Sequence, residues 1–128
     1  MINDSVLFRG ISEETGEWVY GYLYILGKGS ECSETYILGN LDYRESVHDL
    51  WKCATRVIRK TIGQYTGLKD KNAKPIFGGD IVINDVGKKR IVEYYNGRFS
   101  PFILFPEYNC WNAWECEVVG SIYDNYTK

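Results

Sequence analysis

The sequence predicts a mainly β protein built from short antiparallel strands, folded as a small barrel or sandwich. Aromatic residues make up 16% of the 128 residues, and eleven of them are tyrosines, which favours half-buried sheet surfaces. Several short runs alternate in side-chain character, as strands do. Thirteen glycines against three prolines supply many turns between these runs, at a spacing typical of small all-β folds.

The first predicted element is a β-hairpin near the N-terminus. Residues 6–12 (VLFRGIS) and 18–26 (WVYGYLYIL) are its two strands, and the Thr15-Gly16 pair marks the turn between them. In the second strand the aromatic residues fall on one face and the aliphatic residues on the other. We therefore expect both faces to be half-buried. A third strand is expected at 35–40.

The segment 44–60 (RESVHDLWKCATRVIRK) is less regular. Ser46 followed by Asp49 resembles a capping box, and the apolar residues that follow keep a helical phase to about Cys53. Residues 55–60 then alternate as a strand. The sequence therefore predicts a short helix or irregular segment followed by a strand.

The C-terminal half predicts four more strands, separated by turns. Asn96-Gly97 is a strong hairpin signal because both residues tolerate positive φ angles. Pro101 suggests an edge or a bulge, and Gly120 a break. A turn is expected at 86–90, and a loop or single helical turn at 106–114. The expected strands are 80–85, 91–95, 99–105 and 115–125.

The stretch 61–85 (TIGQYTGLKDKNAKPIFGGDIVIND) is the most site-like part of the chain. A phosphate-binding loop needs Gly-Lys-Ser/Thr at the start of a helix, whereas Gly78-Gly79 leads into a strand. A calcium loop would begin at Asp70 and Asn72, but Lys74 then stands at a ligand position and repels the cation.

The remaining interpretation of this stretch is two turns joined by a short strand. Asp and Asn suit turns because their side chains accept hydrogen bonds from nearby backbone N–H groups, and Gly suits positive φ. The expected structural turn residues are Gly67, Asp70, Asn72, Gly79 and Asp80.

No catalytic residues, metal ligands or cofactor are predicted. The four cysteines, Cys32, Cys53, Cys110 and Cys116, lack the close pairing of a zinc site, so free, partly buried thiols are expected. His48 is the single histidine and has no orienting motif around it. An enzyme is therefore the least favoured class, unless His48, Cys53 and a carboxylate share a buried polar pocket.

Charge is unevenly distributed along the chain, whose net charge is −2. Residues 52–90 hold ten basic and three acidic side chains, between flanks that are both acidic. Either the flanks neutralise this block, or the block is an anion-binding face. In the second case Tyr65 or Tyr94 could stack on bases. The residues expected to contact phosphates are Arg56, Arg59, Lys60, Lys69, Lys71, Lys74, Lys88, Lys89 and Arg90.

Residues 61–82 resemble the signature of the YopX-like proteins of bacteriophages and prophages. Residues 8–23 are similar to the family's opening Phe-Arg-Gly and Gly-x-Trp-x-x-Gly, and residues 117–125 to its closing Glu-Val-Ile-Gly-Asn-Ile-Tyr-Glu-Asn. Ala73 departs from the pattern, because it stands where the family commonly has the glycine of Asn-Gly. Gly78 replaces a more typical acidic residue.

The resemblance implies a mostly β protein with a small SH3-like barrel, encoded by a phage or prophage of a Gram-positive host, and no catalytic signature. We expect residues 1–60 to form an N-terminal β-hairpin region and residues 61–128 the SH3-like barrel core, together in one compact unit with at most one or two short helices.

The expected function is a non-catalytic binding or assembly module. Nucleic-acid binding through residues 52–90 is the alternative. Self-association is expected from the charge segregation and the many aromatic side chains. A phage or host protein is a further candidate partner. No signal peptide or membrane-spanning run is visible in the sequence, so the expected location is the bacterial cytoplasm, with no membrane partner.

Overall fold

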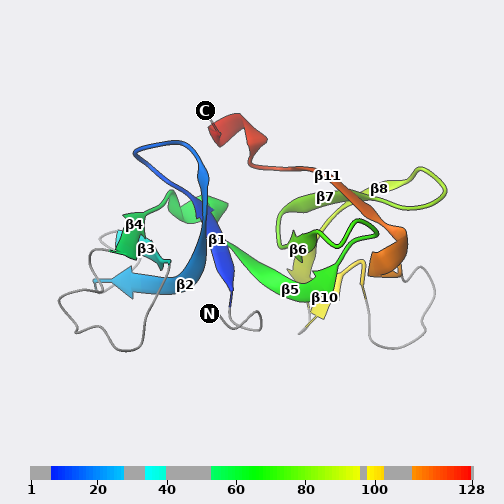
Figure 1. Ribbon diagram of the computed structural model, residues 1–128, viewed down its shortest axis with the longest axis horizontal. Coiled ribbons are helices and arrows are strands. Elements are labelled where there is room, and N and C mark those ends of the chain that lie inside the picture. The colour runs from blue at the N-terminus through cyan, green and yellow to red at the C-terminus, as the bar shows by residue number, and fades with distance from the viewer. Residues whose placement is uncertain (1–6, 28–33, 40–52, 96–97, 103–110, 128) are drawn as a thin grey trace. The chain divides into compact units, whose positions relative to one another are not determined.

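The computed structural model in Figure 1 describes residues 7–27, 34–39, 53–95, 98–102 and 111–127. The protein is mainly β, as expected, and every paired strand is antiparallel. The helices in these ranges are 3₁₀ turns of three residues each, η3 (Arg59–Thr61), η4 (Ala113–Glu115) and η5 (Asp124–Tyr126). No closed barrel is detected within the described ranges.

The strands form two compact units. The first unit comprises residues 1–64 and 126–128, and the second comprises residues 65–125. The expected domains 1–60 and 61–128 stay predictions. The strands of the first unit are β1 (Phe8–Ile11), β2 (Trp18–Leu26), β3 (Glu34–Leu38) and β4 (Ala54–Arg56).

The strand β5 (Gly63–Lys69) contributes residues to both units. Its first two residues pair with β1, and Tyr65 to Lys69 pair with β6 (Pro75–Phe77). The remaining strands of the second unit are β7 (Asp80–Ile83), β8 (Lys89–Ile91), β9 (Glu93–Tyr95), β10 (Arg98–Ser100) and β11 (Glu117–Ser121). They form a three-stranded sheet, ordered β11-β7-β8, and the separate hairpin β9–β10.

The expected N-terminal hairpin is confirmed, and β2 has the expected bounds. This strand changes partner at Gly21: residues 18–21 pair with β1, and residues 22–26 pair with β3. A Cβ atom added at Gly21 would lie 2.2 Å from the carbonyl oxygen of Leu38. Glycine is therefore required where the strand passes from one ladder to the next.

The expected strand at 55–60 is only partly correct. Residues 54–56 form β4, and Val57 bridges to Ser12 beyond the end of β1. Arg59 and Lys60 instead lie in η3, because the Thr61 hydroxyl donates to Ile58 O at 2.6 Å and accepts from Ile11 N at 3.0 Å. The helix expected before Cys53 and the residues Ser46, His48 and Asp49 lie outside the described residues.

In the second unit the two turns expected at 61–85, joined by a short strand, are present. One turn links β5 to β6 at residues 70–74, and a tighter one links β6 to β7. The next turn was expected at 86–90 but spans residues 84–88, so Lys89 and Arg90 lie in β8. The Asn84 side chain fixes this earlier position, since its Oδ1 accepts from Val86 N and Lys88 N.

The expected strand at 91–95 is interrupted at Val92, whose N–H donates to Asp80 O and whose carbonyl accepts from Gly79 N. The next strand ends at Ser100, and residues 103–105 lie outside the described ranges. The last strand is shorter than expected and shifts register between Val118 and Gly120, near the expected break. The Asn96-Gly97 turn also lies outside the described ranges.

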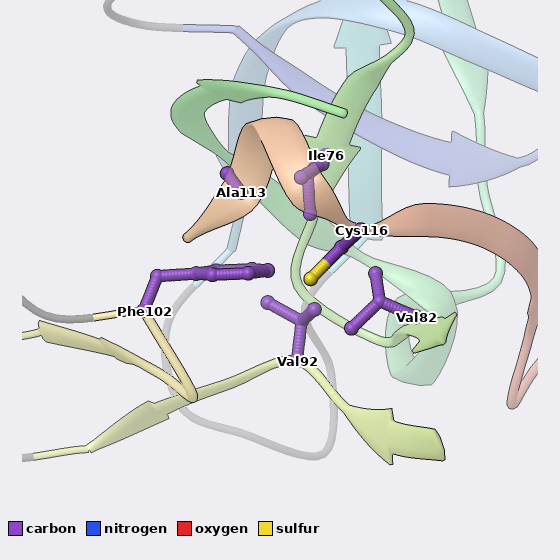
Figure 2. Close-up of a cluster of buried hydrophobic side chains, with 6 residues drawn as sticks. All are labelled: Ile76, Val82, Val92, Phe102, Ala113 and Cys116. Atoms are coloured by element: carbon purple, nitrogen blue, oxygen red, sulfur yellow. The ribbon is translucent and has the colours of Figure 1, made fainter. Parts of the chain in front are cut away.

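The core of the second unit is a cluster of six buried side chains, shown in Figure 2. The Cys116 sulfur points into this cluster, and its thiol donates to Asn112 O at 3.3 Å. Burial, reinforced by Glu115, Asp85 and Asp70, raises the pKa of Cys116 to about 11. The thiol is therefore protonated and unreactive. The six residues are Ile76, Val82, Val92, Phe102, Ala113 and Cys116.

Cys53 and Cys116 are both free thiols, as expected. Cys32 and Cys110 lie outside the described residues.

Candidate functional site

Asp70 is the centre of the turn between β5 and β6. Its side chain is buried, with 5% exposure. One carboxylate oxygen accepts from Asn72 N at 2.8 Å and from Lys74 N at 2.9 Å, and the other accepts from Val118 N at 2.9 Å. The carboxylate therefore holds its own turn in shape and attaches it to β11.

Burial alone would raise the pKa of Asp70, because it disfavours the charged form. The three backbone N–H groups and nearby Lys74 stabilise the carboxylate more strongly, so the pKa lies below its ordinary value of 3.8. Asp70 is consequently ionised at neutral pH. It is fully engaged by the backbone and is a poor candidate for a general base.

The turn between β6 and β7 uses Asp80 and Gly79. Asp80 is almost completely buried, and its carboxylate accepts from Phe77 N at 2.8 Å. Gly79 has φ +91°, and a Cβ atom there would lie 2.8 Å from the Tyr123 ring. Ile122 N also donates to Gly79 O at 3.0 Å. The central signature and the closing motif of the chain are thus in direct contact.

The opening motif, within residues 8–23, also makes contacts that stabilise the fold, in this case inside the first unit. The guanidinium of Arg9, a buried side chain, lies 4.1 Å from the centroid of the Trp18 ring. A Cβ atom at Gly10 would lie 3.0 Å from the Cβ of Val57. These residues hold β1 close to β2 and to the residue after β4.

The nine basic candidates are divided between the two units. Arg56, Arg59 and Lys60 belong to the first unit, and the other six belong to the second. The first unit holds eight basic and nine acidic residues, and the second holds seven and eight. Each unit therefore has a net charge of −1, although the chain shows a basic block when read in order.

Several of these cations already have partners. Arg56 pairs with Glu13 at 3.3 Å and with Glu34 at 3.7 Å. Lys71 pairs with Glu117 at 3.7 Å. Both arrangements use acidic residues from the flanks, although pairs this exposed contribute little free energy.

Two further cations lie over aromatic rings. The Lys60 Nζ lies 4.5 Å from the centroid of the Tyr126 ring, and the Arg90 guanidinium lies 5.6 Å from that of Trp111. Four lysines have neither an ion pair nor an aromatic contact within the described part of the chain: Lys69, Lys74, Lys88 and Lys89.

Tyr65 and Tyr94, the two candidate stacking residues, differ in accessibility. Tyr65 is buried against Phe77, with ring centroids 5.5 Å apart, so it cannot stack on a base. Tyr94 is exposed and contacts Phe99 edge-on.

The two hairpin turns of the second unit lie beside the start of β11. Lys71 N donates to Cys116 O at 2.9 Å. Glu117 pairs in register with Ile83, which directly precedes the turn at 84–88, and the charge of Asp85 acts on Cys116. We call residues 69–74, 84–89 and 112–117 together the hairpin end of the second unit.

The hairpin end carries two strongly exposed apolar side chains that sequence reasoning missed. Val86 is 72% exposed and Trp114 is 67% exposed. Trp114 follows the buried Ala113, and in the sequence alone an aromatic next to small and apolar residues resembles a core position. Its exposure in η4 could not be read from the pattern.

The described residues contain no group of three or more His, Cys, Asp or Glu that could hold a metal ion. None of the helices in the described ranges has the length and hydrophobicity that crossing a bilayer requires.

The fold and these contacts define a small antiparallel β protein whose recognisable motifs build turns and strand contacts. The family model described as YopX protein matches residues 7–127, and the chain belongs to the YopX family. A comparison with curated proteins gave no match.

Proposed function

We propose that the chain is a non-catalytic accessory protein of a phage or prophage that works as a binding or assembly module. The use of the signature supports this proposal. Its two aspartates are buried, and their carboxylates accept hydrogen bonds from backbone N–H groups. These residues stabilise the scaffold of the protein, so we place the function on exposed surfaces outside the signature.

One observation carries the proposal: β2 presents large apolar side chains to solvent. Tyr20, Tyr24, Ile25 and Leu26 each expose between 40% and 49% of their surface. Tyr20, Tyr24 and Leu26 share one face of the strand, because alternate residues of a strand point the same way. Exposed aromatic and aliphatic side chains gathered on one element are characteristic of interaction surfaces.

Affinity capture from phage-infected cells, with and without nuclease, tests this function. We expect a protein partner that resists nuclease, binds again when purified, and is lost in Leu26→Ser. Ile122→Ser is the matched control, since Ile122 is as exposed as Leu26 but lies in the second unit. If both variants retain the partner equally, the interaction does not depend on the exposed face of β2.

Nucleic-acid binding through residues 52–90 is the alternative function. The four lysines that have neither an ion pair nor an aromatic contact among the described residues support it, whereas the net charge of −1 on each unit opposes it. Lys89 also has another role, since β8 is an edge strand of its sheet. Charged side chains on an edge strand prevent pairing with other chains.

The SH3-like barrel is proposed here as the finer description of the fold. The barrel was expected at residues 61–128, and bonds within the second unit support it. Gly79 N donates to Val92 O and Lys71 N donates to Cys116 O, so the turn before β7 reaches the residue after β8, and the turn after β5 reaches the residue before β11. We also propose a cytoplasmic protein that self-associates. Light scattering that shows a strict monomer at high protein concentration would reject self-association.

A further inference from the structure

The two turns at the hairpin end are built alike. In each, the first residue donates its N–H to the carbonyl of the fifth and accepts a bond at its own carbonyl from the N–H of the fourth. In each, the Oδ1 of that first residue, Asp70 or Asn84, also accepts from the N–H groups of the third and fifth residues. The fifth residue is a lysine in both turns, Lys74 and Lys88.

An exposed indole, that of Trp114, lies at the same end of the second unit as the two turns. Trp114 is two residues from Cys116, whose carbonyl accepts from Lys71 N. Since two residues span at most about 7 Å, the backbone of Trp114 lies close to the first turn. The 67% exposure of its side chain leaves much of the indole surface available to a ligand.

The charge that remains at the hairpin end is positive. The Glu117 carboxylate forms an ion pair with Lys71, and one of its oxygens lies 3.4 Å from the Nδ2 atom of Asn72. Asp70 is buried and bonded to the backbone. The other charged side chains of the hairpin end are two exposed carboxylates, Asp85 and Glu115, and four lysines: Lys69, Lys74, Lys88 and Lys89.

We propose that the hairpin end binds single-stranded nucleic acid, with Trp114 stacking on a base and Lys74 and Lys88 contacting phosphates. The inference goes beyond the proposed protein-binding role, because it assigns a nucleic-acid ligand to a surface other than β2. An exposed aromatic ring bordered by flexible cations is the arrangement that binds unpaired bases and their backbone. A duplex hides its base faces, so Trp114 adds nothing to duplex binding.

The carboxylates of Asp85 and Glu115 limit the affinity that we expect for the nucleic acid. They oppose the phosphates, so binding is weak and depends steeply on salt. With two lysines on phosphates, removing both should make the slope of log K against log salt less negative by about 1.4, since each phosphate contact on a single strand contributes about 0.7.

Fluorescence anisotropy of labelled oligo(dT) and oligo(U), about twelve nucleotides long, tests the inference with the full chain. Titrations at about 50 mM and about 200 mM salt give the slope. We expect both strands to bind more tightly than a duplex of equal length. Trp114→Ala should weaken binding at least about fivefold, and Lys74→Ala with Lys88→Ala should reduce the salt slope.

Val119→Ala is the matched control, because Val119 is an exposed apolar side chain of the same unit that lies outside the hairpin end. It should bind as the unmodified protein does. Equal urea midpoints show that all variants are folded. Absence of binding at low salt overturns the inference and leaves the protein-binding role standing. If Trp114→Ala binds as tightly as the unmodified protein, or if the duplex binds more tightly than the single strands, the hairpin end is not the binding site.

Discussion

Ala73 and Gly87 occupy the fourth position of the two turns at the hairpin end. Both have positive φ, +61° for Ala73 and +86° for Gly87. Steric contacts of the Cβ atom destabilise an L-residue in this left-handed region, whereas glycine has no Cβ atom and is not destabilised. Ala73 is also the residue at which the chain departs from the family's Asn-Gly, so the departure lies on a strained backbone.

Ala73→Gly should stabilise the protein by about 0.5–1 kcal/mol. Relief of the left-handed conformation outweighs the added entropy of glycine in the unfolded chain. Urea unfolding measures the change as a higher midpoint at constant slope.

The second turn supplies the control for this prediction. A Cβ atom at Gly87 meets nothing within 4 Å, so Gly87→Ala isolates the backbone cost and should destabilise by a similar amount. A lower midpoint for Ala73→Gly would contradict the interpretation.

Asp70 makes stability depend on pH in a defined window. Its folded pKa is below 3.8, so its contribution is complete above that value and is lost as the pH falls through the folded pKa. At neutral pH we expect Asp70→Asn to lose about 2 kcal/mol, because the amide carries no charge and offers fewer acceptor sites to the three N–H groups.

Urea unfolding of both proteins between about pH 7 and about pH 2.5 checks this contribution. The difference between Asp70→Asn and the unmodified protein should shrink below about pH 4. A difference that stays constant with pH would show that shape, and not charge, makes Asp70 important.

At the scale of the element, β2 depends on one residue for its change of partner. Gly21→Ala should cost about 3 kcal/mol, the upper end of overpacking, because the new Cβ would meet the rigid Leu38 carbonyl at 2.2 Å. Thermal unfolding measures the loss.

Gly67→Ala is the comparison for Gly21→Ala. Gly67 has φ +83° but open space around it, so it should lose only about 1 kcal/mol, the left-handed backbone cost. Similar losses in the two variants would contradict the close approach at Gly21.

Elements fixed by local pattern could be predicted from the sequence, and those fixed by distant contacts could not. The alternation at 18–26 gave β2 its bounds. The alternation predicts a strand through Arg59 and Lys60, whereas these residues lie in η3, because the hydroxyl of Thr61 bonds to Ile11, fifty residues away in the chain. The turn lies at 84–88 and not at the predicted 86–90, because the Asn84 side chain sets its start.

The candidate site shows the same limit. The sequence supplied the lysines and the turn residues, but it could not show that Glu13 and Glu34 lie beside Arg56 or that Trp114 is exposed. These facts depend on the tertiary arrangement of each unit.

At the scale of the whole molecule, β5 is shared by the two units. Gln64 is exposed and pairs with β1, whereas its neighbour Tyr65 is buried against Phe77. The two ladders meet at this junction, so one or two alanines inserted between these residues leave the register within each ladder unchanged. We therefore expect the single and the double insertion to lower the melting temperature by similar amounts.

A much greater loss from the single insertion would show that the two ladders must keep a common side-chain alternation.

The junction in this strand also bears on how such a gene can change by recombination. An exchange between residues 64 and 65 keeps the pairing of β5 with β1, and its pairing with β6, each within the sequence of one parent. Crossovers at this junction should therefore give folded hybrids more often than crossovers within either ladder.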